Sequence, residues 1–228
     1  MKRVFSLIII CLLLSIILTY DLGANTSADP SSSPVGDMFE HLESQATIVR
    51  LIENHPFPGS ASSFEYLLDK LHIFAAIAGE IEPAFEGHRA TMEGSGVYSV
   101  TDSRRVRGQV EVVYSAPQRR VYFGEGGYRL FWNMRFSGRG IAVVDFREDT
   151  LKNNRRLVAT IRFYGKVDSA PLSALVKIVN LLIPQLINNK INLMIHATER
   201  VMEEFNRNPQ DIYHVLIKSR NISIEERE

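Results

Sequence analysis

Cysteine is almost absent from this chain, and neither sign of charge is in excess. The single cysteine, Cys11, excludes an intrachain disulfide, so the fold has to rely on its core. Lys and Arg total 26 and Asp and Glu also total 26, which leaves no net charge to attract nucleic acid. The 228 residues are 45% hydrophobic and 23% charged, values that exclude collagen, coiled-coil rods and wholesale disorder. We therefore expect one globular domain, or two small ones at most, and no nucleic-acid partner.

The first residues have the composition of an export signal. Lys2 and Arg3 precede an uncharged run, VFSLIIICLLLSIILTY, and small polar residues follow it. This order is typical of a secretory signal peptide, so we predict a signal over residues 1–28 and export to the periplasm or the extracellular space. The alternative is an uncleaved anchor, in which residues 4–20 tether the protein to a membrane. A Pro/Ser-rich linker is predicted over residues 29–36.

Two helices are predicted between this linker and Gly87. Residues 38–54 place apolar side chains at near-helical spacing, although the segment Ile48-Val-Arg-Leu-Ile is alternatively a strand. The second helix is expected to begin at Ser62, where Glu65 completes a capping box, and to end at Gly79.

From Gly87 to Gly165 the apolar residues alternate with polar ones, which predicts an antiparallel meander. The expected strands cover residues 97–101, 106–114, 120–123, 128–136, 140–147 and 157–164. Gly124-Glu-Gly-Gly and Ser137-Gly138 are predicted to be turns, and a phosphate loop is disfavoured at the first because no helix follows it. Each strand has one apolar face, so we expect the sheet to be covered on one side only.

The longest predicted element is an apolar helix near the C-terminus. It spans residues 171–205, with Pro184 placed where a new helix can open, and residues 209–228 are predicted to form a weaker helix and a charged tail. The fold class is therefore α+β, with a single domain over residues 37–208. In it, two helices precede a curved antiparallel meander of six or seven strands, and this meander grips a long C-terminal helix.

This order of elements resembles the helix-grip fold of the START-like and polyketide-cyclase-like superfamily. The resemblance is carried by the meander over residues 98–164 and by the run KVDSAPLSALVKIVNLLIPQLINNKINLMI, and it covers residues 62–205. It implies an apolar cavity between the sheet and the last helix. The superfamily usually has a strand before its two short helices. If no strand forms there, a cystatin-like or nuclear-transport-factor-like fold is the alternative.

No catalytic constellation is evident, which favours a non-enzymatic protein without a cofactor. No G-x-S-x-G motif occurs, and the six histidines show no metal-ligand spacing. His196 and Glu199 share a helix face and could hold half a metal site, but a solvated polar face is the simpler interpretation. Asp145 interrupts the apolar run IAVVDF and has two interpretations. It forms a cross-strand ion pair on the outer face, with Arg135 on a neighbouring strand or Arg162 as the partner, or it is a polar anchor inside a cavity.

A curved sheet that closes on one helix often leaves a concave apolar pocket. We therefore predict an exported, non-enzymatic protein that binds a lipid or another apolar small molecule. One alternative is a scaffold at the membrane surface, docked through the apolar residues 172–183, and another is a cyclase-type enzyme that uses Asp145. The predicted ligand-binding residues are Tyr114, Tyr128, Trp132, Met134, Phe136, Asp145, Phe163, Leu182 and Met194.

Overall fold

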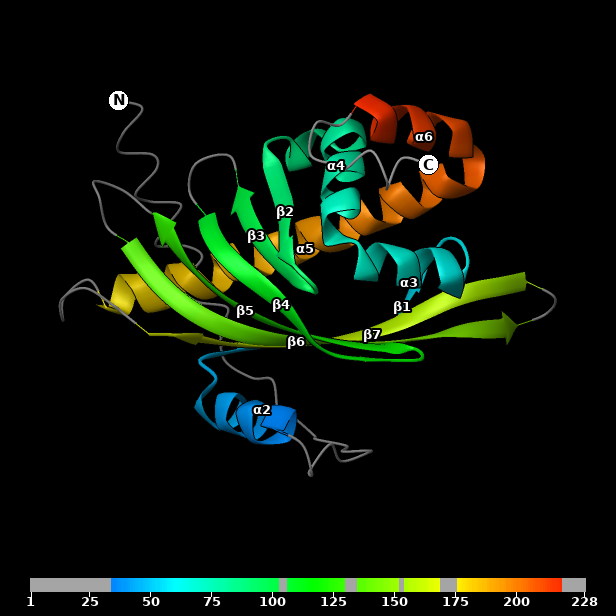
Figure 1. Cartoon of the computed structure of the whole chain (residues 1–228). Coiled ribbons are helices and arrows are strands. Elements are labelled where there is room, and N and C mark those ends of the chain that lie inside the picture. Colours follow the sequence, from blue (N-terminus) through cyan, green and yellow to red (C-terminus); the bar gives the residue numbers. More distant parts are fainter. Residues whose placement is uncertain (1–33, 103–105, 130–134, 152–153, 169–175, 219–228) are drawn as a thin grey trace, which may run out of the picture. The chain divides into compact units, whose positions relative to one another are not determined.

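The computed structural model describes residues 34–102, 106–129, 135–151, 154–168 and 176–218 (Figure 1). The chain divides into two compact units, Met1–Ser31 and Ser32–Glu228, and all described residues belong to the second. The predicted signal lies outside the described residues, as do the last residues of the predicted tail. Within the described part, no helix is both long enough and apolar enough to cross a membrane.

In the second unit, one strand and three helices precede the six consecutive strands of the meander. In chain order its elements are α2 (Pro34–Gln45), β1 (Ile48–Phe57), α3 (Ala61–Asp69), α4 (Leu71–Ile81), a 3-10 turn (Pro83–Phe85), β2 (His88–Gly94), β3 (Val97–Asp102), β4 (Val106–Ala116), β5 (Arg119–Arg129), β6 (Arg135–Leu151), β7 (Asn154–Val167), α5 (Val176–Arg207) and α6 (Pro209–Lys218).

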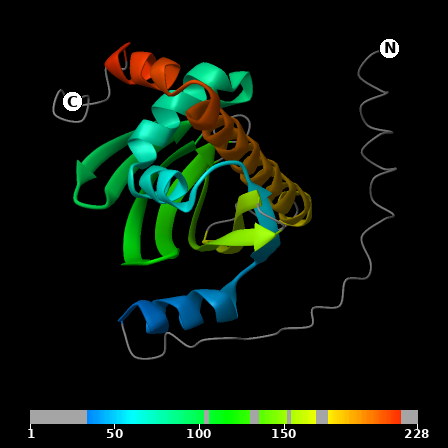
Figure 2. The same ribbon diagram turned by 90° about the vertical axis from the view of Figure 1, so that its right-hand side faces the viewer.

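The strands form one antiparallel sheet of seven, in the order β1-β7-β6-β5-β4-β3-β2. The chain runs as a meander from β2 to β7, and β1 closes the far edge by pairing with β7. The sheet is curved, and α5 crosses one of its faces (Figures 1 and 2). The α+β class, the curved meander, the helices before it and the long C-terminal helix are confirmed.

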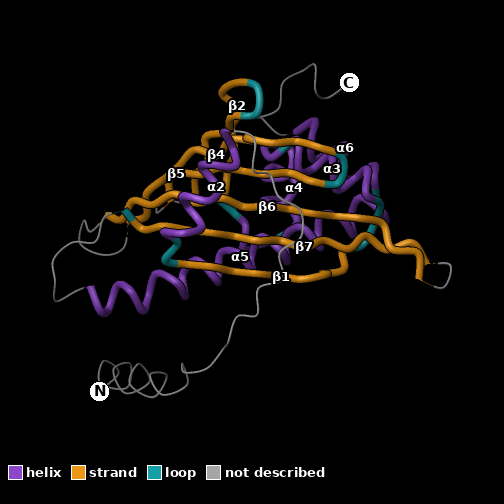
Figure 3. The backbone as a smooth tube through the Cα atoms, turned by 90° about the horizontal axis from the view of Figure 1, so that it is seen from below, coloured by secondary structure: helices purple, strands orange, loops and turns teal. Residues whose placement is uncertain are grey.

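Helices cover both faces of the sheet, contrary to the prediction that only one side would be covered. The inner face packs against α3, α4 and α5, and α6 packs against α4 and α5, while α2 lies on the opposite, outer face (Figures 1 and 3). Leu42 of α2 is buried there against Val121, Ile141 and Val143. The odd-numbered residues of β6 between 141 and 145 therefore face α2, and the even-numbered ones face α5, because side chains alternate along a strand.

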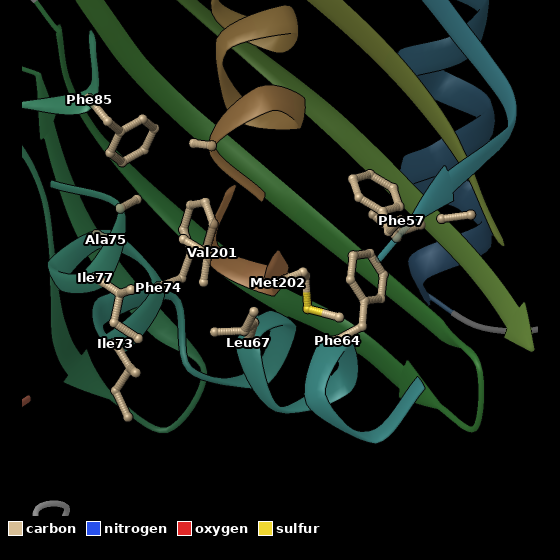
Figure 4. Close-up of a cluster of buried hydrophobic side chains, with 14 of the residues drawn as sticks. Phe57, Phe64, Leu67, Ile73, Phe74, Ala75, Ile77, Phe85, Val201 and Met202 are labelled. Atoms are coloured by element: carbon tan, nitrogen blue, oxygen red, sulfur yellow. The ribbon is translucent and has the colours of Figure 1, made fainter. Parts of the chain in front are cut away.

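The main core lies on the inner face, near the C-terminal half of α5 (Figure 4). Met202 of α5 is fully buried in a cluster with Phe57, Phe64 and Leu67, and Ile77 of α4 is equally buried. Arg120 attaches α3 to the sheet beside this core. Its guanidinium is almost inaccessible and donates hydrogen bonds to both carboxylate oxygens of Asp69, at 2.6 and 2.8 Å. These hydrogen bonds raise the pKa of Arg120.

The predicted helix over residues 38–54 is wrong beyond Gln45, and the alternative strand is present. β1 begins at Ile48, and β-branched residues there pair with β7. The second predicted helix is also divided in two. Ser60 rather than Ser62 caps α3, and Lys70, with φ −127° and ψ 62°, separates α3 from α4.

The two predicted glycine turns are also wrong, because both segments lie inside strands. Residues 124–127 belong to β5, and Gly138 belongs to β6. The predicted strands over residues 120–123 and 128–136 are accordingly replaced by one continuous β5 and the start of β6. Pro184 does not open a new helix either, since α5 continues through it for 32 residues in all.

Candidate functional site

A cavity of about 410 Å³ lies between the inner face of the sheet and the N-terminal half of α5. We call it the glycine-floored cavity, because glycines on four adjacent strands make up much of its lining. The glycines at inner-face positions are Gly108, Gly124, Gly126, Gly138, Gly140 and Gly165, and Gly127 also lines the cavity. The volume lies within the range of small-molecule sites in proteins.

The glycines of the floor face one another across the strands. Gly108 pairs with Gly126 and Gly126 with Gly138, while Gly124 pairs with Gly140 and Gly140 with Gly165. Directly opposed residues in an antiparallel pair share a face, so all six positions leave the inner face without side chains. This absence of side chains leaves the space that the cavity occupies.

Four of these glycines, Gly108, Gly126, Gly138 and Gly140, are also required by the close approach of the backbone. A Cβ on Gly108 would lie 2.5 Å from the carbonyl oxygen of Glu125, and one on Gly126 would lie 2.7 Å from that of Arg107. Gly124 differs, because a Cβ there would meet nothing closer than 3.7 Å. The cavity at Gly124 can therefore be filled by substitution without forcing the strands apart.

The walls of the cavity are mainly aliphatic and aromatic. Val100, Val110 and Ala142 line it from the sheet, Phe163 lines it from β7, and Ile187 closes it from α5. Tyr122 also lines it, and its hydroxyl donates a 2.9 Å hydrogen bond to the carbonyl oxygen of Leu68. Burial raises the pKa of Tyr122, so this phenol remains neutral and polar only at its tip.

The polar residues that line the cavity include one end of a buried ion pair. Lys190 of α5 donates to the carboxylate of Asp102 and lies 3.1 Å from Nε2 of His88. Asp102 is mostly buried, with a side-chain exposure of 10%, and its charge is balanced by Lys190. This cluster therefore presents a neutralised ion pair, rather than a free charge, to the cavity.

A second hollow, of about 280 Å³, lies between β1 and α5 and is called here the side hollow. Its polar lining includes Arg50, His55, His196 and Glu199. Glu199 accepts from Nε2 of His55 at 2.8 Å and lies 3.5 Å from Nδ1 of His196. His196 also lies 3.3 Å from Glu82, and its side chain is 58% exposed.

Arg50 differs from the other charged residues of the side hollow. Its side chain is half-buried, and its Nε is shielded from solvent without a hydrogen-bond partner. Within the part of the chain that the structure describes, no group of three or more His, Cys, Asp or Glu residues is arranged to hold a metal ion.

Asp145 lies on the outer face of the sheet, away from both hollows. It forms ion pairs with Arg119 and with Arg162, the latter at 2.7 Å, and its hydrogen bond raises the pKa of Arg119. The structure therefore has the cross-strand pairing that was one of the two interpretations of this residue. Its partner on β7 was anticipated, whereas Arg119 was not.

The other predicted ligand-binding residues are distributed over several environments. Phe163 lines the glycine-floored cavity, whereas Met194 is 43% exposed on α5. Tyr114 is 45% exposed and pairs with Val121 of the outer face. A register shift between Val112 and Tyr114 moves the tyrosine off the face predicted from simple alternation.

The remaining predicted residues are not placed as side chains. Trp132 and Met134 lie outside the described residues. Tyr128, Phe136 and Leu182 belong to β5, β6 and α5, but the structure describes only their backbone. The prediction that these five residues bind ligand stays a prediction.

The glycines of the floor were missed as site residues, although the sequence contained a signal for them. Gly124 and Gly126, and likewise Gly138 and Gly140, are two positions apart, and Gly108 lies at an apolar-face position of its alternating segment. Glycine inside a strand marks a close backbone approach or a ligand, and such spacing puts all of them on one face. Arg50 was not identified either, since the segment around it was expected to be helical.

No protein-family model matches this chain, and no curated protein matches it. Among solved structures, an uncharacterized protein from Rhizobium leguminosarum is 14% identical over 68% of this chain and 94% of that one, with a TM-score of 0.41. Ara h 8.0201 is also 14% identical, over 68% of this chain and 99% of that one, with a TM-score of 0.39. The function proposed below is therefore inferred from the geometry of the two hollows.

Proposed function

We propose that this protein is a non-enzymatic binding protein that holds an apolar small molecule or a lipid in the glycine-floored cavity. The observation that carries the proposal is the cavity itself, about 410 Å³ of space lined by aliphatic and aromatic groups beneath α5. A concave space of this size with a mainly apolar lining is typical of small-molecule sites, so it favours an occupant. Removing apolar ligand surface from water supplies the free energy of binding.

The two alternatives receive less support from the structure. A cyclase-type reaction at Asp145 requires this carboxylate to point into the cavity, and it lies on the outer face with two arginines. Docking to a membrane or partner through residues 172–183 depends on side chains that lie outside the described ones. We therefore retain the binding protein as the proposal.

Two finer points belong to the same proposal. We propose that the helix grip is of the START-like kind, which is supported by the strand β1 before α3 and α4, the meander, and α5 across its inner face. We infer from the sequence alone that residues 1–28 direct export. Sequencing the N-terminus of the protein recovered outside the cytosol would test this, and an intact Met1 on a cytosolic protein would contradict it.

The cavity is tested by filling it at the one floor position with room for a side chain. Gly124→Leu should lower the affinity for a neutral apolar probe, dodecanol, by tenfold or more, since about 1.4 kcal/mol corresponds to tenfold. Gly94→Leu is the matched control, because a Cβ on this strand glycine would meet nothing within 4 Å and Gly94 does not line the cavity. Displacement of a fluorescent apolar dye would report affinity, and circular dichroism would confirm that both variants fold. Equal affinity of the two variants, or no binding of dodecanol by the unmodified protein, would reject the proposal.

A further inference from the structure

The side hollow and the glycine-floored cavity share the wall that β1 and α5 form. Ile48 lines the cavity and Arg50 lines the side hollow, two residues further along the same face of β1. Two residues of a strand span about 7 Å. Arg50 also pairs directly with Phe163, whose ring lines the cavity. On α5 the lining passes from Lys190 in the cavity to Asn192 in the side hollow.

Among the described basic residues that line the two hollows, Arg50 stands out because it has neither an ion-pair nor a hydrogen-bond partner. Among the described residues, Lys190 pairs with Asp102, Arg139 pairs with Asp168, and Lys166 donates to Gln45. No hydrogen bond or ion pair is found for Arg50 in the described ranges, and its Nε is shielded from solvent. A half-buried guanidinium loses part of its hydration, and without an anion no ion pair compensates this cost.

The nearby carboxylate does not neutralise Arg50. Glu199 is the acidic residue of the side hollow, and His55 and His196 contact its two oxygens, at 2.8 and 3.5 Å. The donors that remain for an incoming group are the Arg50 guanidinium and the amide of Asn192. A planar guanidinium binds carboxylate and phosphate oxygens in a paired geometry that other side chains do not provide.

We propose that the ligand is an amphiphile whose apolar part fills the glycine-floored cavity and whose anionic head, a carboxylate or a phosphate, is bound by Arg50 in the side hollow. This inference rests on the proposed function and adds the chemical class of the ligand. The apolar lining supplies affinity without regard to head group, and Arg50 supplies the preference for an anion.

The test compares three probes with the same chain and different heads: dodecanoate, dodecyl phosphate and dodecanol. The unmodified protein should bind at least one of the two anions about tenfold more tightly than the alcohol, the size expected for a hydrogen bond to a charged group. The two anionic probes distinguish a carboxylate head from a phosphate head. Arg50→Gln should remove the preference and leave dodecanol affinity unchanged.

Arg107→Gln is the matched control, since Arg107 is exposed on β4 and does not line either hollow. If dodecanol binds but neither anion is preferred, the inference is rejected while the proposed function stands. An anion preference that survives in Arg50→Gln also rejects it, because the head is then bound elsewhere. If no probe binds at all, the proposed function fails, and the inference fails with it.

Discussion

Strand β7 carries Leu157 at one end of its inner face and Gly165 at the other. Leu157 is completely buried among α3, α5 and the sheet, whereas Gly165 lines the cavity. Strand β6 repeats the contrast, with Phe146 in the core and Gly138 on the cavity floor. The same face of the same strands therefore has a packed end and a glycine end. Alternation sets which residues point inward, and side-chain size decides whether the interior is filled.

The helix above the sheet follows the same division. Ala197, Val201 and Met202 of α5 are fully buried over the packed end, where Figure 4 shows Val201 and Met202 among the phenylalanines. Ile187 and Lys190 lie over the glycine end and are only half-buried. The packed end anchors α5, and the glycine end leaves room beneath it. The packed end of the inner face therefore contributes to stability, and the glycine end provides the space for the proposed ligand.

The largest loss of stability is expected from a substitution at the packed end of the sheet. Leu157→Ala should lower the free energy of unfolding by about 2 to 5 kcal/mol, because it removes a fully buried side chain and leaves a void. Denaturant unfolding followed by circular dichroism measures the change. A loss below about 1 kcal/mol would mean that this end relaxes around the void, and the contrast with the glycine end would not hold.

A smaller loss of stability is expected at the glycine end of the sheet. There a new Cβ crowds the neighbouring strand, whereas Leu157→Ala leaves a void. Gly126→Ala puts a Cβ 2.7 Å from the carbonyl oxygen of Arg107 and 2.8 Å from Cα of Gly108, so the strands have to shift. We expect destabilisation of about 1 to 3 kcal/mol in the same unfolding assay. Gly124→Ala, with nothing closer than 3.7 Å, is the control and should stay within about 0.5 kcal/mol of the unmodified protein. Equal losses at both positions would refute the backbone explanation.

The smallest change in stability is expected at a glycine outside the cavity. It isolates the conformational cost of glycine from the effect of crowding a side chain against the backbone. Gly79 lies inside α4, and a Cβ there would meet nothing within 4 Å. Gly79→Ala should therefore raise the free energy of unfolding by about 0.5 to 1 kcal/mol through helix propensity alone. A melting temperature that falls would show that Gly79 has a packing role that the structure does not reveal.

Most of the secondary structure was predictable where the local pattern was long. The strands around Val110 and Ile161 alternate over many residues, and the helix around Met202 repeats its apolar face over several turns. The prediction failed at residues 48–54, where a short amphipathic segment fits both periods. It failed again at residues 124–127, since glycine marks turns and close strand contacts alike.

The sequence predicted the type of site, an apolar pocket, but did not predict most of the residues that line it. An apolar pocket under the last helix was expected, and Phe163 lies in it. Tyr114 was expected on the same face, but a bulge at Val113 turns it to the other side of the sheet. Arg50 and the glycine floor depend on which strands are neighbours, and β1 joins β7 across more than a hundred residues of chain.

Local sequence patterns were enough to predict the α+β class, the central strands and the long apolar helix, because these follow from periodicities within single segments. Only the tertiary structure decided that six glycines from four strands meet on one floor, that Asp145 faces outward, and that Arg50 lies beside an apolar cavity without a partner. The physical reason is that register and burial arise between segments, and strand pairing brings together residues whose spacing along the chain does not reveal their contact.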